Sequence, residues 1–125
     1  MPKAPYAFPY QGSKRKLADT ILMHVPQQIE RLVEPFAGSA AVSLAALHRM
    51  QVKRIVLNDS NAALIALWQC VLDDPTGLAD EYERLWHAQA GREKAFYNEM
   101  RDQFNATQAP YLLLFLLLRC VKAAV

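Results

Sequence analysis

The chain has few residues of the types that hold metals or form disulfides. It contains two cysteines and three histidines among 125 residues, and they do not recur at the spacing of metal ligands. Cys70 and Cys120 lie within apolar helical patterns and are expected to be buried free thiols, which fits a cytoplasmic protein. No nearby sequence pairs a histidine with a nucleophile, so we expect neither a metal site nor a catalytic histidine.

Long apolar runs and glycine-rich loops are also missing. The first ten residues have no apolar stretch of signal-peptide length, so no export is expected. The run YLLLFLLL at 111–118 is followed closely by Arg119 and Lys122. It falls far short of the roughly 20 residues of a membrane span and is expected to form a buried helix. The four glycines form neither the loop followed by Lys-Ser/Thr of triphosphate sites nor the three-glycine motif of dinucleotide sites.

The chain does have enough apolar sequence for one small domain, and its charge is unevenly divided. Hydrophobic residues make up 53% of the sequence, which is sufficient for a core in a chain of this length. Residues 1–60 carry eight Lys and Arg against four Asp and Glu (8 − 4 = +4), whereas residues 61–125 carry six against eight (6 − 8 = −2). The basic first part permits a polyanionic partner without establishing one.

The hydrophobic periodicity of residues 1–60 predicts the opening unit of a parallel α/β sheet. Ser13 can cap a helix that stops at Pro26, which puts the cations of SKRK (13–16) in its first turn. Cations there oppose the helix dipole, so we expect them to serve a ligand. Strands are predicted at 31–36 and 54–59, with a helix between them over GSAAVSLAALHRM. A strand, a glycine turn, a helix and a strand in this order predict a right-handed crossover between parallel strands.

From Asn61 onward the pattern is wholly helical, which divides the chain into parts at 1–60 and 61–125. Two parallel strands are too few for a sheet that stands alone. The last helix is apolar on all sides and needs cover. We therefore expect the chain to be part of a larger fold, with cover from outside residues 1–125. The predicted helices of the second part span 61–74, 75–90, 92–105 and 110–125.

The segment VEPFAGSAA, residues 33–41, is typical of the point where a nucleotide-type ligand meets a parallel sheet. Gly38 allows close backbone approach, and Asp59 follows it by 21 residues (59 − 38), the spacing at which an acid takes ribose hydroxyls. Alternatively, the small residues only let a helix pack closely on a strand. Glu34 would repel phosphate and attract an ammonium or sulfonium. S-adenosylmethionine has that charge pattern. Its ribose would bind to Asp59, its amino group to Glu34, and its carboxylate to a cation such as Lys14.

Three motifs, PYQGSKRKL, VEPFAGSAAVSLA and VLNDSNAALIALWQCV, occur in this order and resemble the N-terminal half of the bacterial Dam-like DNA adenine methyltransferases. FYNEMRDQFN and YLLLFLLLRCVK resemble the helices that lead into the target-recognition region of these enzymes. The resemblance runs from Pro9 to the last residue and implies the N-terminal part of a Rossmann-like fold, an incomplete sheet on its own. One departure is Ala40, where many relatives have glycine and where a methyl group narrows the approach of the cofactor. The residues implied to bind S-adenosylmethionine are Tyr10, Lys14, Glu34, Phe36, Gly38 and Asp59.

A second departure is the catalytic motif of that family, Asp-Pro-Pro-Tyr, which does not occur in these 125 residues. Its carboxylate and carbonyl accept hydrogen bonds from the adenine amino group, and its tyrosine stacks on the flipped base. The resemblance therefore implies the cofactor-binding part or subunit of an adenine methyltransferase, with no catalytic residue in this chain. Its partners would be double-stranded DNA and a second polypeptide that carries the motif. The alternative is a non-catalytic interaction or regulatory subunit that retains the fold.

Two cations and five aromatic residues leave more than one interpretation open. Arg15 and Lys16 are either solvated surface or a flank beside a DNA cleft, because phosphate contact needs only mobile cations. Aromatic residues at helical intervals are more often core than base-stacking platforms. We therefore expect a core position for Trp68, Trp86, Phe96, Tyr97 and Phe104.

Overall fold

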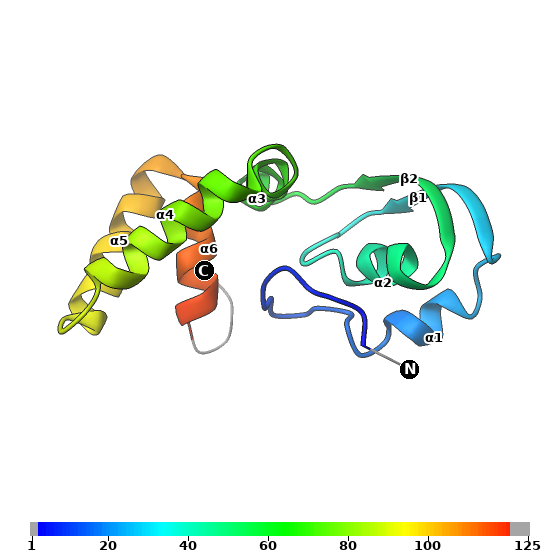
Figure 1. Cartoon of the computed structure of the whole chain (residues 1–125), viewed down its shortest axis with the longest axis horizontal. Coiled ribbons are helices and arrows are strands. Elements are labelled where there is room, and N and C mark those ends of the chain that lie inside the picture. The colour runs from blue at the N-terminus through cyan, green and yellow to red at the C-terminus, as the bar shows by residue number, and fades with distance from the viewer. Residues whose placement is uncertain (1–2, 121–125) are drawn as a thin grey trace. The chain divides into compact units, whose positions relative to one another are not determined.

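The computed structural model describes residues 3–120 and divides into two compact units (Figure 1). The first unit ends at Ser60 and the second begins at Asn61. Strands and helices alternate in the first unit, whereas the second is built from helices.

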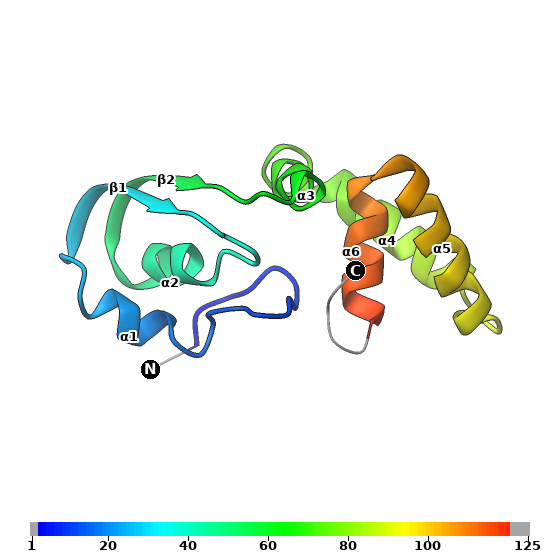
Figure 2. The ribbon, with the colours of Figure 1, turned by 180° about the vertical axis from the view of Figure 1, so that it is seen from behind.

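The first unit is a strand, helix and strand preceded by a short helix. Its elements are α1 (Ala18–Leu22), β1 (Gln28–Glu34), α2 (Ala41–Arg49) and β2 (Gln51–Leu57). The two strands pair in parallel, with Gln28 opposite Gln51 and Glu34 opposite Leu57. This confirms the predicted parallel unit, and α2 lies against one face of the sheet in both views (Figures 1 and 2).

Both strands begin and end earlier than the hydrophobic pattern predicts. β1 ends at Glu34 because Pro35 has no N–H with which to continue the ladder. At the other end, the Gln51 N–H donates to the Gln27 carbonyl at 3.1 Å, and Lys53 Nζ lies 2.9 Å from Glu30 Oε1. Polar residues therefore join the pairing through backbone and side-chain contacts, which leave no trace in a hydrophobic pattern.

The predicted helix from Ser13 to Pro26 is wrong at both ends, because α1 spans only Ala18–Leu22. α1 begins only at Ala18, because Ser13 is engaged elsewhere. Its N–H donates to the Tyr10 carbonyl at 3.1 Å across a turn in which Gly12 has a φ of +81°. Its Oγ lies 2.9 Å from the Oγ of Ser39. The cations of SKRK thus lie in an irregular segment before the helix. They do not occupy a first helical turn and therefore do not oppose a helix dipole there.

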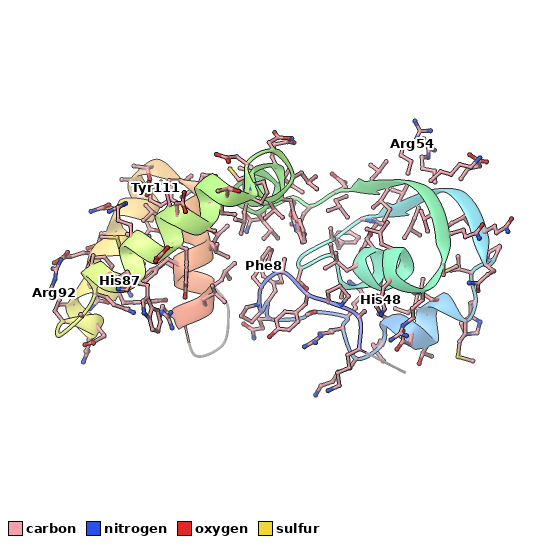
Figure 3. The ribbon with its side chains drawn as sticks, viewed as in Figure 1. Phe8, His48, Arg54, His87, Arg92 and Tyr111 are labelled. Carbon is pink, nitrogen blue, oxygen red and sulfur yellow. The ribbon has the colours of Figure 1, made fainter. Side chains whose placement is uncertain are left out.

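The core of the first unit lies between α1, α2 and one face of the sheet. Its buried residues are small or aliphatic, which lets the two helices approach closely. The other face carries Val33 and Val56, paired in register and 48% and 40% exposed. Arg31 and Arg54 are also paired in register, and Arg54 projects from β2 away from α2 (Figure 3). The core cluster consists of Ala18, Leu22, Val42, Ala45 and Ala46, with Val25, Leu32, Met50 and Val52 packed against it.

Residues 61–120 of the second unit form four helices, as the sequence predicts. They are α3 (Ala62–Asp73), α4 (Pro75–Ala88), α5 (Glu93–Thr107) and α6 (Pro110–Arg119), and the predicted end of the last helix at 121–125 lies outside the described residues. Side-chain caps fix the start of two of them. Asn61 Oδ1 accepts from the Leu64 N–H at 3.2 Å, and Asp74 Oδ1 accepts from the Gly77 N–H at 3.0 Å. These bonds satisfy N–H groups that have no partner within the helix.

The expectation that α6 needs cover from outside the chain is wrong for most of its surface. α6 packs against α3, α4 and α5, and Phe115 meets Phe96 edge to face with ring centroids 5.6 Å apart. Periodicity identifies an all-round apolar helix but not the neighbours that surround it. None of the helices within residues 3–120 has the length and apolar character of a membrane span. The side chains buried on α6 are Leu112, Leu113, Phe115, Leu116 and Leu117.

Several side chains differ from their expected burial. Trp68, Phe96 and Phe104 are buried, but Trp86 is 45% exposed, with the Arg119 guanidinium 4.0 Å from its ring centroid. Cys70 and Cys120 are free thiols, as expected, but are only partly buried. The three histidines are exposed, and Figure 3 shows His48 on α2 and His87 on α4.

Candidate functional site

The turn that joins β1 to α2 has an unusual backbone. Phe36, Gly38 and Ala40 all have positive φ angles, of 55°, 54° and 54°. Glycine adopts this conformation without strain, but a residue with a Cβ atom is disfavoured there by about 1–2 kcal/mol. The turn is held against the end of β2, because the Ala37 N–H donates to the Asn58 carbonyl at 2.9 Å. A strained turn held by its surroundings is common at ligand-binding sites.

Asp59 is brought to this turn from the end of β2. Its Oδ2 accepts a hydrogen bond from the Gly38 N–H at 3.1 Å. The two residues therefore meet at the carboxyl edge of the parallel strands, where ligands bind in open α/β sheets. The bond from the Gly38 N–H orients the Asp59 carboxylate at the turn, and a carboxylate has two oxygens with about four acceptor positions.

Glu34 lies under the same turn as the last residue of β1. It is only 7% exposed, and its Oε1 accepts from both the N–H and the Oγ of Ser43, at 2.9 and 2.6 Å. Ser43 is in the first turn of α2, so the carboxylate also meets the positive end of the helix dipole. A buried carboxylate needs such hydrogen bonds, and Glu34 therefore orients the helix as well as the turn.

The segment before α1 contacts the turn at two points. A Cβ atom at Gly38 would lie 3.1 Å from Tyr10 Cδ1 and 3.2 Å from Tyr10 Cε1, so the tyrosine ring covers the glycine. The second point is the contact between the hydroxyls of Ser13 and Ser39 at 2.9 Å. Gly38 is thus favoured both by its backbone conformation and by the ring above it.

The structure brings four of the predicted site residues to one turn, namely Tyr10, Glu34, Gly38 and Asp59. Phe36 belongs to the turn, but its side chain is 77% exposed. Lys14 is exposed on the neighbouring segment. The sequence pattern did not indicate the serines whose hydrogen bonds hold the site together, because these roles depend on tertiary contacts. These are Ser13, Ser39 and Ser43.

Arg15 and Lys16 are exposed, and both line a cavity of about 750 Å³ together with Tyr10. This position is compatible with both interpretations, a solvated surface and a flank beside a DNA cleft. Lys14 is absent from the lining of this cavity. The guanidinium of Arg15 lies 3.9 Å from the ring centroid of Tyr6, which holds it on the cavity side.

The close fit around Gly38 predicts a measurable coupling to Tyr10. Gly38→Ala should lower the free energy of unfolding by about 2–3 kcal/mol, because it adds positive-φ strain and a contact with the ring. In a Tyr10→Ala background the same change should cost only about 1–2 kcal/mol. Gly12→Ala is the control, since Gly12 has positive φ but no heavy atom within 4 Å of its added Cβ. Hydrogen exchange of the β1 and β2 amides measures these values, and equal costs in both backgrounds would contradict the assigned contact.

These features define an α/β unit with parallel strands, a glycine turn and an acid at the end of the second strand, an arrangement that is typical of adenosine-binding α/β folds. The family of D12 class N6 adenine-specific DNA methyltransferases matches residues 10–125. The chain therefore belongs to this family.

Three relatives indicate how much of a family member the chain represents. It is 31% identical over 102 residues to the DNA adenine methylase of Haemophilus influenzae, covering 82% of this chain and 34% of that protein. It is 27% identical over 105 residues to the type II methyltransferase M.MjaIII of Methanocaldococcus jannaschii, covering 77% of this chain and 36% of that protein. It is 33% identical over 96 residues to the retron Ec67 DNA adenine methylase of Escherichia coli, covering 77% of this chain and 31% of that protein. The chain thus spans about a third of the length of these relatives.

Proposed function

We propose that the chain is the cofactor-binding part of a site-specific DNA adenine methyltransferase and that it holds S-adenosylmethionine at the turn between β1 and α2. The observation that carries this proposal is the bond from the Gly38 N–H to Asp59, beside the buried carboxylate of Glu34. Asp59 would accept hydrogen bonds from the ribose hydroxyls. Bound S-adenosylmethionine supplies an electrophilic methyl group on its sulfonium.

The charges at the turn favour this cofactor over a nucleotide phosphate. Glu34 and Asp59 are two carboxylates at one turn, so they repel phosphate and attract the ammonium and the sulfonium. Lys14, exposed on the segment that covers the turn, is proposed to bind the carboxylate of the cofactor. Phe36 offers an exposed ring as an apolar surface for the adenine.

The proposed reaction needs residues that these 125 do not include. The motif Asp-Pro-Pro-Tyr, which would bind the adenine amino group, does not occur in the sequence. We propose that a further polypeptide segment, or a second chain, supplies it and completes the sheet. The exposed side chains of Val33 and Val56 support this, since parallel strands are normally covered on both faces. A non-catalytic subunit is the alternative, but it would not need the set of Tyr10, Lys14, Glu34 and Asp59.

A complementation assay tests this proposal. The 125-residue chain is mixed with duplex DNA and radiolabelled S-adenosylmethionine, alone or after co-expression with the motif-containing portion of a related methylase. We expect no labelled adenine with the chain alone and labelled adenine with the complemented chain. Glu34→Gln in the complemented chain is the control, which should lower transfer through weaker cofactor binding. Transfer by the chain alone would contradict the proposed division of roles.

A further inference from the structure

The cavity beside Tyr10 has a lining that suits an anion. It has a volume of about 750 Å³ and lies between the segment before α1, α1 itself and α2, a size typical of small-molecule sites. One part of its wall is apolar, formed by residues such as Phe8 and Ala45. The charged residues that line it are Lys3, Arg15, Lys16, Arg49 and Asp19.

Within residues 3–120, three of the four cations that line the cavity belong to no ion pair. The single carboxylate, Asp19, is held by Arg49 with Oδ1 and Nε 2.6 Å apart. The ion pairs of the described part of the chain, residues 3–120, do not include Lys3, Arg15 or Lys16. Three cations around one concave surface produce a positive potential that attracts an anion.

The geometry of Arg15 selects the kind of anion. Its guanidinium lies 3.9 Å from the ring centroid of Tyr6, so the aromatic face fixes the plane of the group. A stacked guanidinium keeps its N–H edge available, and that edge matches the oxygens of a phosphate in a bidentate contact. Lys16 adds a mobile point charge to the same cavity.

This cavity differs chemically from the cofactor turn that it adjoins. Glu34, Phe36, Gly38 and Asp59 are not among its lining residues, whereas Tyr10 and Ser39 are. The turn is acidic and the cavity is basic, so a sulfonium cofactor and a phosphate are drawn to different places. We propose that Arg15, Lys16 and Lys3 form a phosphate-binding site, and that its ligand is a backbone phosphodiester of DNA. The choice of DNA rests on the proposed function, whereas the phosphate chemistry does not.

A pair of charge-matched variants tests the site in the full 125-residue chain. Arg15→Gln/Lys16→Gln removes two cations from the cavity, and Lys53→Gln/Arg54→Gln removes two exposed cations from β2. Binding of a fluorescent DNA duplex is measured at several salt concentrations. Binding of adenosine monophosphate is measured as well and compared with that of adenosine, which lacks the phosphate. S-adenosylmethionine is titrated into each variant by calorimetry.

We expect the cavity variant to bind the duplex about tenfold more weakly at low salt and to lower the salt slope by about two. The β2 variant should change the duplex affinity and the salt slope much less. The cavity variant and the β2 variant should each bind S-adenosylmethionine as the unchanged chain does. Loss of adenosine monophosphate binding with unchanged duplex binding would support the phosphate site but assign it to a free nucleotide. Equal duplex defects in both variants would overturn the site, as would a cofactor defect confined to the cavity variant. Failure of all chains to bind S-adenosylmethionine would contradict only the proposed function.

Discussion

Asp59→Ala should weaken the binding of S-adenosylmethionine by about 1.5–3 kcal/mol, which is roughly a tenfold to 150-fold rise in the dissociation constant. The expected loss is large because the carboxylate would accept charge-assisted bonds from the ribose, and its Oδ2 also accepts from the Gly38 N–H. Isothermal titration of each variant with S-adenosylmethionine measures the change.

Two further variants separate the ribose contact from the integrity of the turn. Asp59→Asn keeps an oxygen that can accept from Gly38, so it should lose less affinity than Asp59→Ala. Asp19→Ala removes a carboxylate that is exposed and paired with Arg49, and should leave cofactor affinity unchanged. If Asp59→Ala bound S-adenosylmethionine as tightly as the unchanged chain, the ribose assignment would be wrong.

Glu34→Ala should cause the second large effect, on folding as well as binding. It leaves the Ser43 N–H and hydroxyl, which donate to Glu34 Oε1 at 2.9 and 2.6 Å, without that acceptor. Each buried polar group left unsatisfied costs about 1–3 kcal/mol, so we expect the free energy of unfolding to fall by about 2–4 kcal/mol. Urea denaturation with hydrogen exchange of the β1 amides measures this loss.

A conservative change separates the structural role of Glu34 from its charge. Glu34→Gln retains an oxygen that can accept from Ser43, so most of the stability should remain while the attraction to the cofactor ammonium is lost. Glu30→Ala is the matched control on the same strand. Glu30 is exposed and pairs with Lys53 across the surface, so its loss should cost at most about 1 kcal/mol. Equal stability of the Glu30 and Glu34 alanine variants would show that the Ser43 bonds contribute little.

The order of elements was predictable because it depends on local patterns. Short β-compatible runs of apolar residues indicated two strands around a helix, and proline and asparagine marked the starts of later helices. The spacing of Gly38 and Asp59 indicated that they share one sheet edge, because both follow strands that pair in parallel. The bond between them agrees with that topology. Its use by a ligand remains a prediction.

Other features depended on contacts between distant residues and were not predictable. Ser13 has the chemistry of a helix cap, but its hydroxyl meets Ser39 instead, which moves the start of α1 to Ala18. The apolar α6 gave no sign of which helices would surround it. The cavity that Arg15 and Lys16 line was not predictable, because a sequence pattern does not show that the preceding segment turns back on itself.

The central claim is that this chain binds S-adenosylmethionine at its acidic turn, and direct titration of the purified 125-residue chain tests it most simply. Calorimetry with S-adenosylmethionine is compared with calorimetry with adenosine triphosphate, which shares the adenosine but carries phosphates in place of the sulfonium amino acid. We predict saturable binding of S-adenosylmethionine that is absent in Asp59→Ala at the same concentrations, and no competition by adenosine triphosphate. Absence of S-adenosylmethionine binding by the folded chain, or its displacement by adenosine triphosphate, would contradict the claim.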